Sequence, residues 1–271
     1  MKEIASAEFD AVVSEAGREW VIMSGLERSI FNKISRHKAL KDWDIKINYG
    51  IKTGYNEAFI IDEETKDRLI KEDKKSAELI KPLLRGRDID KYIYHNNGLY
   101  LINTHNGVKE SNIKPIDVNK YKAIKKHLDK YYSQLEKRGD KGITPYNLRN
   151  CAYLEEFEKP KIVWGNISSE SRFCYSPDTM VVNAPANMLI HNDEITLKYL
   201  LAVMNSKVFN YQFTNFGITL GQAYEWKKQY VEPLKIPEAD SKTKNNITKL
   251  VDDIIMLKKQ DKDTTPLEKK D

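Results

Sequence analysis

The chain has 271 residues, with 45 Lys plus Arg against 40 Asp plus Glu, a net charge of +5 and 40 % hydrophobic residues. This length suits one large domain or two small ones, and the sequence has neither a long apolar run nor the basic-then-apolar start of a signal peptide. Only Cys151 and Cys174 are present, which excludes a disulfide framework, so we expect a cytoplasmic protein with no membrane partner.

The first third of the chain alternates between helical and strand patterns. Ser24 and Glu27 have the spacing of a capping box, and an apolar stripe follows them. Apolar residues then alternate with polar ones up to Ile51, which is typical of a half-buried strand, and an apolar run follows a short polar stretch. The elements expected here are a helix from Ser24 towards Leu40, a hairpin over residues 44–61 with its tip at 52–57, a helix after Asp62 and a helix over 76–84.

The charge is concentrated between Lys109 and Arg149, where eleven basic and five acidic residues give a net +6. Apolar residues recur there at helical spacing from Tyr121, with Gly139 as a natural end, and most of the lysines fall off the apolar face. This pattern has two interpretations. It is either a solvated helix face or an electrostatic footprint for nucleic-acid phosphates.

The rest of the chain predicts short strands, a long helix and a helical end. Ile247 begins a series of apolar residues spaced three, four and three, which is a heptad pattern. That helix either folds back onto its own domain or docks onto a second subunit or domain. The expected elements are strands at 99–102, 161–164, 179–182 and 188–190, a helix from about Asp193, a polar linker over 240–246 and the final helix.

We find no catalytic motif in the sequence. The Walker A, Gly-x-Gly-x-x-Gly and Gly-x-Ser-x-Gly patterns are absent, and the histidines show no metal-ligand spacing. Asp44 and Lys46 match half of a metal-dependent nuclease signature, but the upstream Pro-Asp is missing. The Asn-Pro-Pro-Tyr motif of adenine-N6 methyltransferases is missing as well. We therefore expect no catalytic residues, no metal site and no cofactor in this chain.

Several stretches in an ordered succession resemble the TaqI-like C-terminal specificity region of Type IIG and related restriction-modification enzymes, and the resemblance covers about residues 20 to 237. The stretches are Gly50–Asp62, Ile80–Ile89, Leu135–Arg138, Tyr146–Arg149, Lys159–Trp164 and Tyr199–Ser206. The resemblance implies a target recognition domain that binds double-stranded DNA and works with an adenine-N6 methyltransferase domain or subunit, often beside an endonuclease. It also implies that S-adenosylmethionine and Mg²⁺ belong to those catalytic domains. The chain would be either a fragment of such an enzyme or a separate specificity subunit.

For the fold we expect the α+β class, with a twisted, mainly antiparallel sheet, flanking helices and a C-terminal helical arm. We expect three parts: an N-terminal helical lead-in (1–40), the target recognition domain (41–238), and a spacer or docking helix with its tail (239–271). An alternative function is a protein-interaction subunit that assembles a modification complex through its last helix. The residues expected to contact a partner helix are Leu250, Ile254 and Leu257.

The DNA-contact candidates are basic residues for phosphates and polar or aromatic loop residues for base edges. Arg85 and Arg87 have an alternative role, since ion pairs with Asp88 or Asp90 would brace the fold instead. The phosphate candidates are Lys52, Arg85, Arg87, Lys122, Lys125, Lys126 and Arg149. The candidates for base edges are Asn56, Tyr146, Asn147, Asn166, Ser168 and Gln222, with Tyr55 beside them as a further DNA-binding residue.

Overall fold

The computed structural model describes residues 9–12, 21–177, 179–216, 219–220 and 223–269. The strands are β1 (Phe9–Val12), β2 (Val21–Ser24), β3 (Lys38–Ala39), β4 (Lys46–Tyr49), β5 (Ile60–Asp62), β6 (Ile80–Arg85), β7 (Leu99–Ile102), β8 (Lys161–Gly165), β9 (Ile167–Ser168), β10 (Cys174–Ser176), β11 (Val181–Asn183), β12 (Ala186–Ile190), β13 (Thr219–Leu220), β14 (Ala223–Glu225) and β15 (Lys235–Ile236). Antiparallel pairing dominates, and β6 with β11 is a parallel pair.

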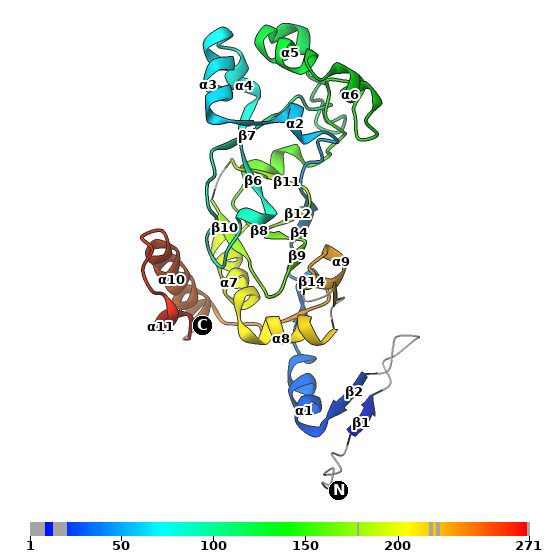
Figure 1. Ribbon diagram of the computed structural model, residues 1–271. Helices are drawn as coiled ribbons and strands as arrows, with labels where there is room; N and C mark the ends of the chain where they lie inside the picture. Colours follow the sequence, from blue (N-terminus) through cyan, green and yellow to red (C-terminus); the bar gives the residue numbers. More distant parts are fainter. Residues whose placement is uncertain (1–8, 13–20, 178, 217–218, 221–222, 270–271) are drawn as a thin grey trace, which may run out of the picture.

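Helices surround these strands (Figure 1). The α-helices are α1 (Gly25–Ile34), α2 (Asn56–Phe59), α3 (Glu63–Glu72), α4 (Ser76–Leu79), α5 (Lys122–Asp129), α6 (Tyr132–Lys137), α7 (Glu194–Asn205), α8 (Lys207–Phe216), α9 (Lys228–Val231), α10 (Ser241–Lys258) and α11 (Thr265–Glu268). The 3-10 turns are η1 (Leu40–Asp42), η2 (Gly86–Asp88), η3 (Val118–Lys120) and η4 (Leu154–Glu158). The predicted α+β class, with mainly antiparallel sheets, is confirmed.

Two four-stranded sheets form the centre of the molecule, in the orders β10-β8-β12-β4 and β11-β6-β7-β5. The middle strands of the first sheet, β8 and β12, are buried at nearly every position. Val163 and Met188 belong to one hydrophobic cluster, around α2, α3 and α5. Ile162 and Leu189 belong to a second cluster, around α7, α8 and α10. Because successive side chains of a strand point to opposite faces, this sheet supplies one face to each cluster.

Small residues allow the two sheets to meet closely. A Cβ on Gly50 would lie 2.5 Å from the Asn183 carbonyl carbon, and one on Gly86 would lie 3.0 Å from Cα of Gly165. The first distance is shorter than any real contact, so a larger residue at position 50 would push β4 away from the chain between β11 and β12.

The predicted hairpin over 44–61 is wrong, although both of its apolar segments form strands. β4 pairs with β12, and β5 pairs with β7, so the two segments belong to different sheets. The close approach at Gly50 lets the chain cross from one sheet to the other, and residues 52–57 form the crossing segment and the start of α2. Local alternation predicts a strand but does not identify its partner.

The predicted helix boundaries differ from the structure in further places, and the helix expected from Ser24 towards Leu40 already ends at Ile34. The helix expected over 76–84 ends at Leu79, and the chain continues as strand β6. Pro82 lies in this strand, and a helix through it would lose a backbone hydrogen bond because proline has no N–H. The helix expected up to Gly139 is split into α5 and α6. The expected linker 240–246 is mostly the start of α10, because the Asp240 side chain accepts a hydrogen bond from Thr243 N. The capping box at Ser24 is confirmed, and the helix expected from about Asp193 begins after Asp193, whose side chain accepts a hydrogen bond from Thr196 N.

The C-terminal arm packs along α7 (Figure 1). Lys198 Nζ lies 2.8 Å from Asp252, and the Thr248 hydroxyl donates to the Ile195 carbonyl at 3.2 Å. Val251 and Ile254 are fully buried in the second cluster. The arm therefore follows the first interpretation, a helix folded back onto its own chain. In the described residues, no helix is long and apolar enough to cross a membrane.

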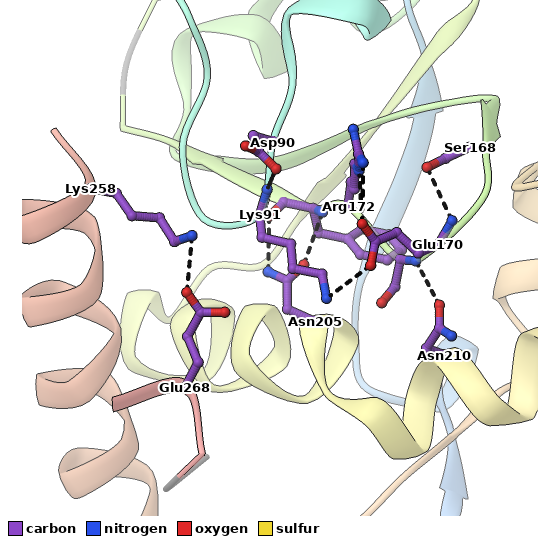
Figure 2. A network of polar contacts seen from close by, with 11 residues as sticks. Asp90, Lys91, Ser168, Glu170, Arg172, Asn205, Asn210, Lys258 and Glu268 are labelled. Carbon is purple, nitrogen blue, oxygen red and sulfur yellow. Dashed lines mark hydrogen bonds and ion pairs between the residues drawn. The ribbon is translucent and has the colours of Figure 1, made fainter. Parts of the chain in front are cut away.

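A network of polar side chains joins the chain after β9 to the helices beneath it (Figure 2). The Asn205 side chain pairs with both backbone groups of Phe173, at 3.0 and 2.9 Å, and Asn210 Oδ1 accepts from Ser171 N at 2.7 Å. Glu170 pairs with Lys91 at 3.5 Å. Because Phe173 is buried, Asn205 satisfies two backbone groups that water does not reach.

Candidate nucleic-acid interface

Residues 52–56 meet two later segments, residues 129–132 and 138–150, at the end of the molecule that carries α5 and α6 (Figure 1). We call them the loop cluster. Gly54 has a φ of +69°, and a Cβ there would lie 2.9 Å from the Asp140 carbonyl oxygen. The rings of Tyr55 and Tyr131 are 6.0 Å apart. A positive φ together with this close approach explains why glycine occupies position 54.

Arg138 holds the loop cluster together from inside. Its guanidinium donates to the backbone carbonyls of Thr53, Pro145 and Asn147 and lies 4.5 Å above the ring of Phe59. Burial lowers the pKa of Arg138 to about 10, so the side chain is still charged at neutral pH. Arg138 therefore joins residue 53 to residues 145–147 and does not face solvent.

Tyrosines and lysines share the surface between α5 and residue 146. The Tyr146 hydroxyl donates to Asp129 at 2.5 Å, and Lys125 Nζ lies 2.8 Å from the same carboxylate and 5.2 Å from the Tyr146 ring centroid. Tyr132 is exposed, with its ring 5.7 Å from that of Tyr146. The hydrogen bonds from Lys125 and Tyr146 hold the pKa of Asp129 below its usual value. Aromatic rings beside an ammonium group suit contacts with bases and phosphates.

A hollow of about 490 Å³ opens at the other side of the loop cluster. Arg149 lies on its wall and pairs with Asp140 at 3.0 Å. The residues that line it are Asn106, Lys141, Gly142, Ile143, Arg149 and Asn150. Of these, the sequence predicted Arg149 alone. The residue in the sequence that could have indicated this site is Ile143, an isolated large apolar residue between a lysine-glycine pair and a proline turn.

Two residues predicted to contact bases are buried, which corrects their role. Asn147 is 1 % exposed, and its Nδ2 donates to the Ile116 and His105 carbonyls, while its Oδ1 accepts from Thr144 at 2.5 Å. Asn166 is buried, and its Oδ1 accepts from Asn187 at 2.7 Å. The two amides hold the fold, and neither is available to a base.

The two arginines after β6 have different surroundings. Arg85 forms a bidentate pair with Asp88, with Nε and Nη2 2.8 and 2.9 Å from the carboxylate oxygens. Burial raises the pKa of Asp88, but the hydrogen bonds and charge of Arg85 outweigh it and hold the pKa below its usual value. Arg85 therefore braces the turn η2, which is the alternative expected for it, whereas Arg87 is exposed.

The model of the TaqI-like C-terminal specificity domain matches residues 81–236, more than half of the chain. The chain belongs to this family of specificity domains. A curated relative, the Type II methyltransferase M.MjaIV of Methanocaldococcus jannaschii, is 25 % identical over 237 residues, which cover 86 % of this chain and 78 % of that protein.

Two solved restriction-modification enzymes share the fold of this specificity domain. The Type IIL enzyme MmeI in complex with DNA matches with a TM-score of 0.59 and 13 % identity, over 79 % of this chain and 28 % of its own. The type IIG restriction endonuclease BpuSI matches with a TM-score of 0.53 and 14 % identity, over 86 % and 30 %. This chain thus spans less than a third of either enzyme.

The remaining predicted contacts of the specificity domain are spread over several surfaces. Lys52 and Asn56 are exposed in the loop cluster, with the Asn56 Oδ1 accepting from Thr53 at 2.6 Å. Lys122 and Lys126 are exposed on α5, where Lys126 lies 3.8 Å from Glu72 of α3. Arg85, Arg87, Asn166 and Ser168 lie away from the loop cluster, near the junction of the sheets. Ser168 also belongs to the network of Figure 2. Gln222 lies outside the described residues.

The nuclease and partner-helix residues can also be placed. Asp44 is exposed at a turn with a φ of +54°, and the described part of the chain contains no group of three His, Cys, Asp or Glu residues that could hold a metal. Ile254 is buried against the protein's own core, whereas Leu250 and Leu257 are partly exposed on α10. Of the three, Ile254 is therefore unavailable to a partner helix.

Proposed function

We propose that this specificity domain binds double-stranded DNA through the loop cluster and directs an adenine-N6 methyltransferase, carried by another domain or subunit, to its target sequence. The observation that carries the proposal is the family match over residues 81–236, which includes residues 129–150 of the loop cluster. A relative that is a methyltransferase, and a solved enzyme of the same fold bound to DNA, support it.

Two ion pairs, one between α5 and the loop cluster and one inside the cluster, suit a contact with the DNA backbone in which a phosphate replaces the carboxylate. Lys125 and Arg149 each have a carboxylate partner at about 3 Å, on surfaces open to water. Exposed ion pairs of this kind contribute only about 0–1 kcal/mol, so a phosphate can replace the carboxylate at little cost. Binding would then release counterions from the DNA and depend on salt.

Methyl transfer, and DNA cleavage where it occurs, would be carried out by the partner domain or subunit. The methyltransferase would bind S-adenosylmethionine and extrude the adenine, and an endonuclease domain, where one is present, would bind Mg²⁺. The specificity domain would hold the duplex beside the extruded base and determine which adenine is reached. DNA methylated by the assembled system should therefore contain N6-methyladenine after digestion to nucleosides, and methylation at cytosine would contradict the adenine assignment.

A salt titration tests the DNA contact. We expect the logarithm of the association constant for a duplex to fall linearly with the logarithm of the salt concentration, and Lys141→Ala with Arg149→Ala to reduce that slope by about 1 to 2. Lys242→Ala is the matched control, because Lys242 is an exposed lysine on α10, away from the loop cluster. A flat titration of the wild-type chain, or an equal effect of the control, contradicts the proposal.

A further inference from the structure

We infer that Ile143 and Asn150 form a base-reading element that enters a groove of the duplex, an inference that rests on the proposed function and extends it. Ile143 is 70 % exposed and is one of the residues that line the hollow beside the loop cluster. A single exposed isoleucine means little, because apolar side chains are common on protein surfaces. Ile143 differs from such side chains in how its loop is held and in which residues surround it.

The loop that carries Ile143 is fixed by hydrogen bonds. Its backbone N–H donates to Asn106 Oδ1 at 2.8 Å, and Gly142 N donates to the Asn147 carbonyl at 2.9 Å. A Cβ on Gly142 would overlap the Asn106 side chain, at 2.3 Å from Oδ1. The Asn147 carbonyl also accepts from the buried Arg138. Ile143 is thus presented to solvent by a built loop, and little ordering entropy is lost if it enters a groove.

The amide beside Ile143 is oriented as a donor. Asn106 Nδ2 donates to Asn150 Oδ1. The Nδ2 group of Asn150 has no acceptor among the described residues, and the side chain is exposed. Base edges in both grooves carry acceptors, and the thymine methyl group or an opened base step offers an apolar partner for isoleucine.

Two cationic residues lie close to Ile143 and Asn150 in the sequence. Lys141 precedes Ile143 by two residues, with its Nζ donating to the Glu136 carbonyl, and Arg149 precedes Asn150 and pairs with Asp140. Cations beside an exposed apolar side chain and an amide match a duplex, in which phosphates border a groove floored by bases. A protein partner would not require this arrangement.

The experiment selects preferred sites from a randomised duplex library with the full wild-type chain and compares variants on the selected and a scrambled duplex. We expect Ile143→Ala and Asn150→Ala each to lower the preference for the selected duplex by about 5- to 100-fold, which corresponds to one base contact, with scrambled binding and its salt slope unchanged. Both side chains are exposed, so the unfolding midpoint should not move.

The matched controls are Ile167→Ala, at a residue 61 % exposed on β9, and Asn246→Ala, at an exposed residue on α10. Both should keep the wild-type preference. Retained preference in Ile143→Ala and Asn150→Ala, an equal loss in the controls, or a wild-type chain without any preference overturns the inference. Salt-dependent binding of the scrambled duplex separates these results from failure of the proposed function, which would abolish binding to both duplexes.

Discussion

Arg138 places a buried positive charge against three backbone carbonyls, so its removal should affect folding before it affects DNA. We expect Arg138→Ala to lower the free energy of unfolding by about 3 kcal/mol, because the carbonyls of Thr53, Pro145 and Asn147 lose a charged donor. Arg149→Ala, at an exposed ion pair, should cost less than about 1 kcal/mol. Urea unfolding followed by circular dichroism measures both, and equal effects would contradict the structural role.

His127 makes stability depend on pH. The Ala58 carbonyl accepts a hydrogen bond from Nε2 at 3.0 Å, so the neutral ring has a bare Nδ1, which is buried without a partner among the described residues. Burial holds the pKa of His127 below its usual value. The unfolded chain therefore binds the proton first, and the stability is full above about pH 7 and falls as the pH drops below about 6.5.

The measurement is a series of urea midpoints between pH 5 and 8. His127→Gln should flatten the fall without abolishing it, because burial also lowers the pKa of His105. A variant with the same slope as the wild type would show that His127 does not titrate with unfolding.

Single residues also show where sequence reasoning ended. Lys52, Asn56 and Arg149 were predicted and are exposed in the loop cluster, because charged and amide residues in polar loops usually face water. Asn147 has the same composition around it and is buried, since its amide pairs with backbone carbonyls 31 and 42 residues away. No local pattern in the sequence indicates partners at that separation.

At the scale of elements, the predictions that held depend on local signals. The helix capped by Ser24 was found because a cap and its N–H partner lie three residues apart, and the helix from about Asp193 was found from its apolar periodicity. The strand at 161–164 was found because Ile162, Val163 and Trp164 form a continuous apolar run. The hairpin failed because strand partners are set by packing over more than a hundred residues, as between β4 and β12.

The helix α10 offers a direct comparison of a buried and an exposed side chain. We expect Ile254→Ala to lower the free energy of unfolding by about 2–5 kcal/mol, because Ile254 is fully buried beside α7 and its loss leaves a cavity. Met256→Ala, at a residue 51 % exposed two positions further on, should change it by less than about 0.5 kcal/mol. Similar urea midpoints for the two variants would show that α10 does not pack on the core.

For the whole molecule, the carboxylates beside the basic groups should restrain binding to DNA of any sequence. Replacing Asp129 and Asp140 by Asn removes the partners of Lys125 and Arg149 and two negative charges, so the net charge rises from +5 to +7. We expect affinity for a scrambled duplex to rise about 3- to 10-fold at low salt, with a steeper salt dependence. Asp253→Asn removes one negative charge at an exposed position on α10, away from the loop cluster, and is the control.

The sheet β10-β8-β12-β4 has a consequence for exchanging specificity between relatives. Val163 and Met188 pack towards the loop-cluster end, while Ile162 and Leu189, next to them on the same strands, pack towards α7. In a chimera that transplants only residues 52–150, strands β8 and β12 would come from the recipient. The transplanted residues that pack against Val163 and Met188 would come from the donor and would not match them. Chimeras with both crossover points outside residues 46–190, so that the whole sheet travels with the loops, should be the ones that fold.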